Sequence, residues 1–283
     1  MTEITIGVAL EAAIARLSAV GVDNPRMDAR LLLCHSACLE LANIIVDPNV
    51  VLADECFRKF ETLVERREKR EPVSHLIGER EFWSLPFIVT ADVLDPRPAS
   101  ETLIEAALDH VRDRSEPVSV LDLGTGSGCL LIAVLSELPG ARGVGVDTSE
   151  AALVIARRNA EKNLVDDCTT FVSSSWGRSV SGSFDLILSN PPYISESERD
   201  DLEPEVAMYE PASALFAGKD GLSAYREVAP DILRLLNPDG VAAIECGRDQ
   251  MTTVIEIFDD AGLRHVETRC DLDGIERSGV FCR

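Results

Sequence analysis

The sequence predicts a doubly wound α/β domain that is preceded by a small helical domain. From Val118 onward, short apolar runs with strand character alternate with helical stretches, which is typical of a parallel sheet covered by helices. Before about residue 70, apolar residues recur at helical spacing instead. Between these parts, residues 75–89 are rich in aromatic and β-branched side chains, which favours a β-hairpin linking the two domains.

The first part of the chain is expected to contain three helices, and the third of them begins at Asp54. The expected apolar faces of the first two are Val8, Ala12, Ile14 and Leu17, and then Ala29, Leu32, Leu33 and Ala37. The third helix runs into a charged stretch at residues 65–70, which is either a solvated helix end or a contact for a macromolecular partner. We therefore predict a helical domain at 1–74, a hairpin linker at 75–95 and an α/β domain at 96–283.

Strands and helices are expected to alternate through the α/β domain. The predicted strands are 118–123, 143–146, 169–172, 184–189 and 241–245. One predicted helix begins near Ser100, and the others cover 129–138, 150–163, 224–236 and 251–261. Two last strands, near 265–270 and 279–282, are expected to form a terminal antiparallel pair.

The composition argues against free nucleic acid as the main substrate. The 283 residues include 27 Lys and Arg against 49 Asp and Glu, a formal net charge of -22. Such a field repels phosphate backbones. The acidity has an equally plain explanation as a solvated surface that has no partner.

The eight cysteines show no metal-binding spacing and no C-x-x-C pair, so no metal site is expected. We interpret them as small buried residues in a reducing cytosol. The N-terminal stretch Met1-Thr2-Glu3-Ile4 lacks the basic segment of a signal peptide, and no apolar run is long enough for a membrane span. We expect a cytoplasmic protein.

A glycine-rich loop lies between the first predicted strand of the α/β domain and its helix, and it follows the acidic residue Asp122. The loop residues are Gly124, Thr125, Gly126, Ser127 and Gly128. Glycines let a ligand approach the backbone, and the helix N-terminus offers free N–H donors. The spacing is G-x-G-x-G, which differs from the G-x-G-x-x-G of dinucleotide-binding loops.

Asp147 ends the second strand of the α/β domain, about 20 residues beyond the glycine loop. An acidic side chain at this place binds ribose hydroxyls in folds of this kind. We expect Asp147 to hold a ribose diol. A role as the N-cap of the following helix is the competing interpretation, and the two roles are compatible with each other.

The strand at 184–189 leads directly into Asn190-Pro191-Pro192-Tyr193. Two prolines prevent the chain from continuing as a strand or entering a helix, so the segment must be a stiff loop. The loop holds an amide, carbonyl acceptors and an aromatic ring at the carboxyl end of a strand. This combination is suited to binding a planar NH2 group.

The combination of these motifs resembles the class I S-adenosylmethionine-dependent methyltransferases, and within them the release factor glutamine methyltransferases, the PrmC or HemK family. The resemblance covers nearly the whole chain. It is carried further by Gly78 to Trp83, Pro96-Arg97-Pro98 with Glu101, Tyr209-Glu210-Pro211, Gly218 with Asp220-Gly221-Leu222, Glu245-Cys246-Gly247, and Asp271 with Gly274 and Arg277.

The resemblance implies a Rossmann-like, seven-stranded class I methyltransferase domain behind an all-helical substrate-recognition domain. It implies methylation of the glutamine side-chain nitrogen (N5) in the Gly-Gly-Gln motif of peptide-chain release factors, with S-adenosylmethionine converted to S-adenosylhomocysteine. The implied catalytic residues are Asn190, Pro191 and Tyr193, with Pro192 completing the substrate site. The implied cofactor residues are the glycine loop, Asp147, Asn190 and Trp176, the last beside the adenine.

Two positions depart from the family pattern: Ser175 stands where an acidic residue is common, and Ala99 stands where Asp or Glu is common. Two alternative substrates share the same catalytic loop. One is a glutamine of a ribosomal protein, and the other is the amino group of a flipped nucleic-acid base, which the negative charge disfavours. A monomer without direct nucleic-acid or membrane contact is expected.

Overall fold

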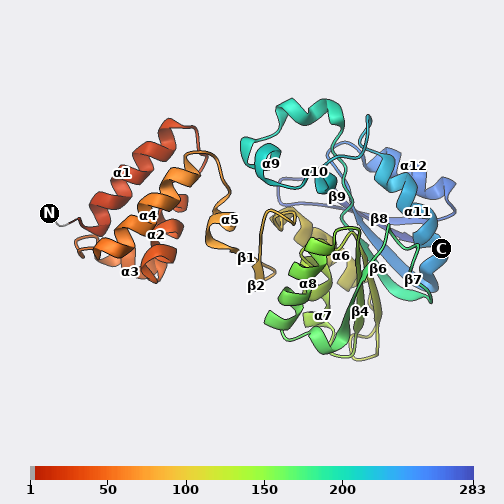
Figure 1. Cartoon of the computed structure of the whole chain (residues 1–283). Helices are drawn as coiled ribbons and strands as arrows, with labels where there is room; N and C mark the ends of the chain where they lie inside the picture. The colour runs from red at the N-terminus through yellow and green to blue at the C-terminus, as the bar shows by residue number, and fades with distance from the viewer. Residues whose placement is uncertain (1–3) are drawn as a thin grey trace. The chain divides into compact units, whose positions relative to one another are not determined.

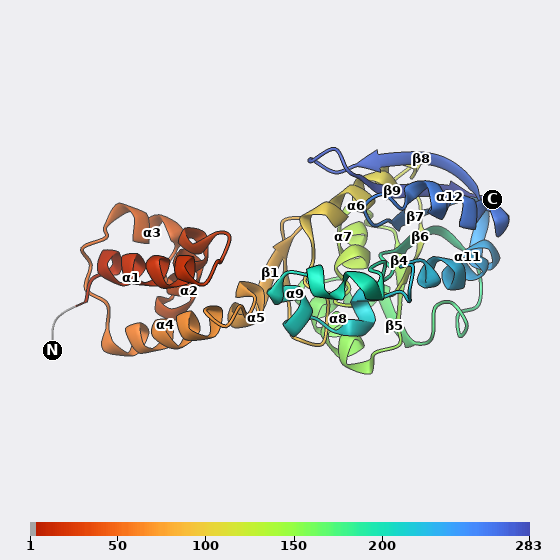
Figure 2. The ribbon, with the colours of Figure 1, turned by 90° about the horizontal axis from the view of Figure 1, so that it is seen from above.

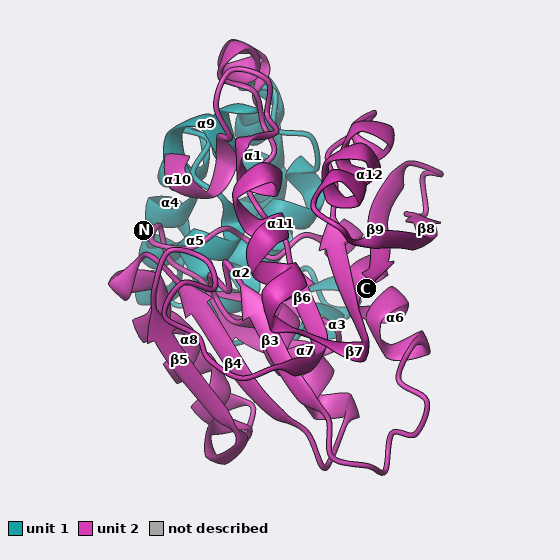
Figure 3. Ribbon diagram, turned by 90° about the vertical axis from the view of Figure 1, so that its right-hand side faces the viewer, with its two compact units in different colours: residues 1–78, 203–209 teal, residues 79–202, 210–283 magenta. Residues whose placement is uncertain are grey.

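The structure, a computed structural model, describes residues 4–283 and divides the chain into two compact units. One unit is the chain up to Gly78 together with Glu203–Tyr209, and the other is Glu79–Leu202 with Glu210–Arg283 (Figure 3). The first residues of the N-terminal stretch considered above, Met1 to Glu3, lie outside the described part.

The helical unit is a bundle around one apolar core. Its helices are α1 (Ile6–Ala19), α2 (Pro25–Ala37), α3 (Leu41–Val46), α4 (Asp54–Arg67), α5 (Val73–Ile77) and α9 (Pro204–Tyr209). The Thr5 side chain caps α1 by accepting a hydrogen bond from the backbone N–H of Val8 at 3.4 Å. Pro25 opens α2, where its missing N–H is not needed. Leu17, Leu33 and Phe60 are fully buried in the core between these helices.

The expected apolar face of α1 is partly wrong. Val8 is 59% exposed and Ala12 is also exposed, whereas Ile6, Ala9 and Ala13 are buried. Nearly every side of this helix carries apolar residues, so spacing alone could not decide which side packs.

The predicted hairpin forms, but it is shorter than residues 75–89. It consists of β1 (Glu79–Phe82) and β2 (Leu85–Ile88), while residues 75–77 belong to helix α5. Gly78 ends α5 in the left-handed conformation, which separates helix from strand. The turn residues Trp83 and Ser84 have φ angles of 53° and 57°, and the N–H of Trp83 donates to Glu101 at 2.9 Å.

The second unit contains the predicted doubly wound sheet (Figure 1). Its order is β5-β4-β3-β6-β7-β9-β8, parallel as far as β7 and antiparallel beyond it. The strands are β3 (Ser119–Leu123), β4 (Arg142–Asp147), β5 (Thr169–Ser173), β6 (Phe184–Ser189), β7 (Leu236–Glu245), β8 (Arg264–Cys270) and β9 (Glu276–Cys282). The terminal antiparallel pair is thus confirmed, at the edge of the sheet (Figure 2).

Helices cover both faces of this sheet. They are α6 (Glu101–Asp109), α7 (Cys129–Glu137), α8 (Glu150–Lys162), α11 (Ser223–Leu235) and α12 (Met251–Asp260). The short helix α10 (Ala212–Leu215) contributes instead to the cavity described below. Alternate residues of each strand point to opposite faces, so Leu186 packs with α6 and α7 while Ile187 packs with α11 and α12. Three-residue 3-10 turns precede α6 at Pro98–Ser100 and β5 at Asp166–Cys168, and a longer one covers Glu196–Asp201.

The cysteines are free thiols, but the expectation that they are buried is wrong for all except Cys246. Cys246 is buried, whereas Cys38 and Cys270 are exposed. Both exposed residues lie where an element ends, Cys38 at the C-cap of α2 and Cys270 as the last residue of β8, so their apolar neighbours in sequence do not cover them. Among residues 4–283, no helix is long and apolar enough to cross a membrane.

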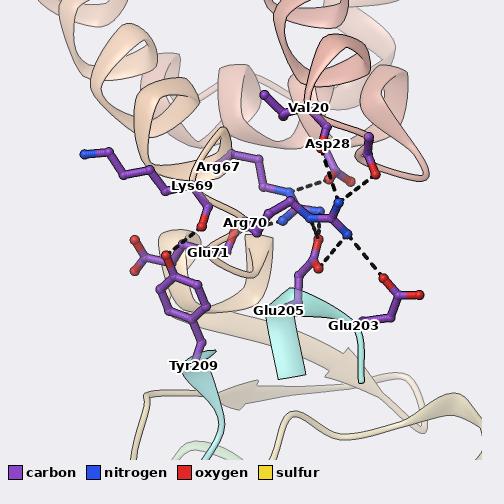
Figure 4. A network of polar contacts seen from close by, with 10 residues as sticks. Val20, Asp28, Arg67, Lys69, Arg70, Glu71, Glu203, Glu205 and Tyr209 are labelled. Atoms are coloured by element: carbon purple, nitrogen blue, oxygen red, sulfur yellow. Dashed lines mark hydrogen bonds and ion pairs between the residues drawn. The ribbon is translucent and has the colours of Figure 1, made fainter. Parts of the chain in front are cut away.

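The segment Glu203–Tyr209 belongs to the helical unit, although the sequence placed it within the α/β domain. Arg67, which is only 6% exposed, binds Asp28 at 2.7 Å and Glu205 at 2.8 Å. Arg70 donates from two nitrogens to the same Glu205 carboxylate, each at 2.7 Å, and the Tyr209 hydroxyl donates to the carbonyl of Lys69 at 2.8 Å (Figure 4). Sequence periodicity could not reveal this attachment because it depends on charges far apart in the chain.

Replacing Arg67 by Met should destabilise the folded protein by about 3 kcal/mol, because the change leaves the poorly exposed Asp28 carboxylate without its cation. Urea unfolding of the full chain, followed by circular dichroism, measures this. Lys59→Met is the matched control, since Lys59 pairs with Glu55 where both side chains are more than 60% exposed, and it should change stability by less than about 0.5 kcal/mol. Equal effects of the two variants would contradict the role of Arg67.

Candidate active site

The glycine loop lies between β3 and α7, and its three glycines adopt positive φ angles. Those of Gly124, Gly126 and Gly128 are 79°, 53° and 81°. At Gly128 a Cβ would also lie 3.0 Å from the Ile132 side chain and 3.3 Å from that of Ala156. The loop therefore needs glycine for its conformation, and at Gly128 for space as well.

Asp147 braces this loop from the end of β4. Its carboxylate accepts from the backbone N–H of Gly126 and from that of Ser149, each at 2.9 Å. The N-cap of α8 is Ser149, whose side chain accepts from Ala152, so the alternative interpretation of Asp147 as the N-cap is wrong. Each Asp147 oxygen accepts one backbone hydrogen bond and retains a lone pair for a hydroxyl donor.

Asp122 lies beneath the loop and is fully buried. Its Oδ2 accepts from the Thr125 hydroxyl at 2.6 Å, whereas Oδ1 has no hydrogen-bond partner among the described residues. Burial raises the pKa of Asp122 to about 7, the Thr125 hydrogen bond opposes this rise, and the nearby charge of Asp147 adds to it. Part of the Asp122 population is thus protonated at neutral pH.

A cavity opens beside the glycine loop within the second unit. Predicted residues in its lining are Gly124, Thr125, Gly126, Ser127, Asp147, Trp176, Asn190 and Pro192. Its walls also include apolar side chains, among them Val93, Leu94 and Leu130. Of the predicted residues, Gly128, Pro191 and Tyr193 do not line the described cavity.

Trp176 reaches this cavity from the segment after β5. A Cβ at Gly124 would lie 3.6 Å from the Trp176 ring, so the ring borders the glycine loop. The indole N–H donates to Glu227 at 3.0 Å, which fixes the ring plane. Ser174 and Trp176 line the cavity, whereas the intervening Ser175 does not.

The Asn190 loop is placed by the pairing of β6 with β3. Asp122 pairs with Leu188, and the Ser189 hydroxyl donates to the carbonyl of Leu123 at 2.7 Å. Asn190 therefore follows directly at the edge where the glycine loop begins. Its side-chain NH2 donates to the hydroxyl of Ser100 at 3.2 Å.

Tyr193 is held behind Asn190 by a second group of residues. Its hydroxyl donates to Glu245 at 3.4 Å, and its carbonyl accepts from the Gln250 amide at 2.9 Å. A Cβ at Gly221, which has a φ of 71°, would lie 2.4 Å from that carbonyl. Gly221 therefore has to be glycine for the loop to pack in this position.

Sequence reasoning missed several supporting residues. Ser100 and Gln250 contact the Asn190 loop. Asn159 links the glycine loop to the hairpin, because its side-chain NH2 donates to the carbonyl of Ser127 at 2.9 Å and its side-chain oxygen accepts from the N–H of Ile88 at 2.7 Å. Ser100, Gln250 and Asn159 are separated widely in sequence from the motifs that they support. The family resemblance, through the neighbouring positions Glu101 and Gly247, pointed to the regions of Ser100 and Gln250, and no motif pointed to Asn159.

Comparisons with known proteins agree along the whole chain. The family described as the PrmC N-terminal domain matches residues 8–78, and the methyltransferase small domain family matches residues 79–215. The release factor glutamine methyltransferase of Caulobacter vibrioides is 43% identical over 275 residues, 97% of this chain and 95% of that protein. The one from Agrobacterium fabrum is 36% identical over 282 residues, 99% and 98% of the two chains.

A solved structure shares the fold at low sequence identity. The catalytic domain of hMettl16 in complex with the MAT2A 3′UTR hairpin 6 aligns with a TM-score of 0.57 and 15% identity, over 83% of this chain and 84% of that chain. At this identity the likeness extends to the fold alone.

Asp122→Asn should stabilise the protein more at pH 8 than at pH 5.5. Because the pKa of Asp122 rises from 3.8 to about 7 on folding, the folded state binds the proton more tightly, and stability falls as pH rises between these values. Asparagine cannot ionise. The melting temperature of Asp122→Asn minus that of the unmodified protein should therefore be at least about 3 °C higher at pH 8 than at pH 5.5. The exposed Asp260→Asn is the control, and an equal change in both variants would refute the assignment.

Proposed function

The chain belongs to the family of release factor glutamine methyltransferases, and from this premise we infer that it is an S-adenosylmethionine-dependent protein-glutamine methyltransferase. The proposed acceptor is the side-chain nitrogen (N5) of the glutamine in the Gly-Gly-Gln motif of peptide-chain release factors. The observation that supports this acceptor at this site is the orientation of the Asn190 side chain. Its NH2 group is engaged with Ser100, so its oxygen remains free to accept from an amide N–H.

The chemical problem is that an amide nitrogen is a weak nucleophile, because its lone pair is delocalised into the carbonyl. We propose that the Asn190 oxygen and the Pro191 carbonyl accept the two N–H groups of the glutamine. Pro192 shapes the loop, and the Tyr193 ring packs on the amide plane. Orientation of this kind can supply several kcal/mol towards the reaction. The methylated nitrogen is positively charged and loses its proton to water, so the site needs no strong base.

The described cavity has the features that S-adenosylmethionine requires. When bound, this cofactor supplies a methyl group on a positively charged sulfur and leaves as S-adenosylhomocysteine. The glycine loop offers exposed backbone at Gly124 and Gly126, whose positive φ angles shape it, beside the side chains of Thr125 and Ser127. The proposed ribose ligand is Asp147, whose oxygens retain lone pairs, and Trp176 is the proposed neighbour of the adenine.

The proposed protein partner is a release factor, with residues 1–74 as the recognition domain, 75–95 as the linker and 96–283 as the catalytic domain. Action as a monomer in the cytoplasm is part of this proposal. The net charge of -22 opposes direct binding of nucleic acid. A glutamine of a ribosomal protein remains the alternative acceptor that an experiment has to distinguish.

Purified release factor incubated with the protein and labelled S-adenosylmethionine should gain one methyl group on the Gly-Gly-Gln glutamine, located by mass spectrometry. A release factor with Gly-Gly-Ala in its place is the control and should remain unlabelled. If a ribosomal protein gained the label while the release factor did not, the proposed acceptor would be wrong.

Asn190→Ala should abolish methyl transfer while cofactor affinity stays within about tenfold, equivalent to about 1.4 kcal/mol. Removing the amide oxygen eliminates one of the two acceptors for the glutamine N–H groups. Asp147→Ala supplies the contrast, because loss of the ribose ligand should weaken cofactor binding in calorimetry by more than tenfold. Full activity of the Asn190 variant, or unchanged cofactor binding by the Asp147 variant, would reject the corresponding role.

A further inference from the structure

A buried polar chain lies behind Asn190. The Asn190 NH2 donates to the Ser100 hydroxyl at 3.2 Å, and the Ser100 hydroxyl in turn donates to Oε2 of Glu245 over a short hydrogen bond. The other Glu245 oxygen accepts from the hydroxyl of Tyr193 at 3.4 Å. Ser100 is 2% exposed and Glu245 is 1% exposed, so these groups exchange few hydrogen bonds with solvent.

The charge of Glu245 dictates the direction of every hydrogen bond in this chain. An ionised carboxylate can only accept, so the Ser100 hydroxyl must use its single hydrogen on Glu245. Ser100 can then only accept from Asn190, which must turn its NH2 group towards Ser100. The Asn190 oxygen is consequently left for the substrate.

We propose that Ser100 and Glu245 are positioning residues that fix the Asn190 amide with its oxygen towards the acceptor nitrogen of the substrate. This inference rests on the proposed function, because it assumes that Asn190 accepts a hydrogen bond from the glutamine amide. Glu245 holds the Tyr193 hydroxyl as well, so a single carboxylate orients both side chains of the substrate site.

Burial raises the pKa of Glu245 above its usual value, while the hydrogen bond from Ser100, the charge of Arg277 and hydrogen bonds from Tyr193 and Asn190 oppose the rise. The ionisable groups that influence it come from several elements: Cys129 of α7, Tyr193 of the Asn190 loop, Tyr225 of α11, Arg277 of β9 and the adjacent Cys246. Arg277 is the cation among them, and it also pairs with Asp271 at 3.0 Å.

Protonation of Glu245 would remove the constraint on direction. A neutral carboxyl group can donate to Ser100, which can then donate to the Asn190 oxygen. The Asn190 amide would then be turned with its NH2 group towards the substrate. An NH2 group only donates, so it could not accept a hydrogen bond from the glutamine N–H. Activity should therefore fall as pH falls through the raised pKa of Glu245.

The experiment compares Glu245→Gln, Ser100→Ala and the control Ser278→Ala in the full-length protein. Ser278 lies opposite Glu245 in the β7–β9 pairing, is fully buried, and its hydroxyl has no hydrogen-bond partner in the described part of the chain. The kcat for release factor methylation is measured at saturating cofactor between pH 5.5 and 8, alongside calorimetric affinity for S-adenosylhomocysteine. Saturation with cofactor removes any effect of Asp122 that acts through cofactor affinity, since Asp122 supports the cofactor loop.

At pH 8, both Glu245→Gln and Ser100→Ala should lower kcat by roughly tenfold or more, with S-adenosylhomocysteine affinity and KM for the release factor within about threefold. The decline of kcat at acid pH should persist in Ser278→Ala and disappear in Glu245→Gln, which cannot titrate. Retained S-adenosylhomocysteine binding shows that each variant is folded. Ser100→Ala tests the hydrogen bonds that link Asn190 to Glu245 without altering the buried charge.

Two outcomes would overturn the inference. One is a kcat of Ser100→Ala and Glu245→Gln within about twofold of Ser278→Ala, and the other is an acid decline that survives in Glu245→Gln. Either result together with an inactive Asn190→Ala leaves the proposed function standing and removes only the positioning role. An active Asn190→Ala would instead remove the amide site on which both depend.

Discussion

The parallel pairing of β3 with β6 is the constraint on which the site depends. Because parallel strands end at the same edge of a sheet, the glycine loop after Leu123 and the Asn190 loop after Ser189 must emerge side by side. The Ser189 hydroxyl, bonded to the Leu123 carbonyl, fixes the two ends to each other. A shift of one residue in this pairing would turn the side chains of β6 to the wrong faces and move Asn190 away from the cavity.

Two buried carboxylates, Asp122 and Glu245, lie at this edge, and each carries a raised pKa because burial disfavours its charged form. Such groups reduce stability near neutral pH unless hydrogen bonds compensate. Asp122 has one such bond, from Thr125, whereas Glu245 accepts from two hydroxyls. An apolar residue at either position would avoid the cost of burying a charge. The presence of carboxylates at both positions is the pattern expected where the orientation of loops takes precedence over stability.

Much of this arrangement could be predicted from the sequence, because alternating apolar runs specify the sheet and because glycine, proline and acidic residues at strand ends specify the two loops. The composition of residues 75–77 is strand-like, so it predicts a longer hairpin than the structure has, because these residues form a helical turn that ends at Gly78. The sequence does not predict which side of α1 is buried, because apolar residues surround that helix. The role of Ser100 could not be predicted from the sequence, although it lies beside Pro96-Arg97-Pro98 and Glu101, because that role follows only from a contact across 90 positions of the chain.

The attachment of Glu203–Tyr209 to the helical unit has a different physical basis from the rest of the fold. Its helix α9 contains no buried residue, so apolar packing contributes little, and the contacts that hold it are those of Arg67, Arg70 and Tyr209. Where α9 ends, the next residue, Glu210, belongs to the second unit and binds Arg97 of the cavity lining. A segment held by poorly exposed ion pairs is more sensitive to the loss of one charge than a segment held by an apolar core. The position of Glu203–Tyr209 within the helical unit therefore depends on ion pairs and hydrogen bonds, and not on an apolar core.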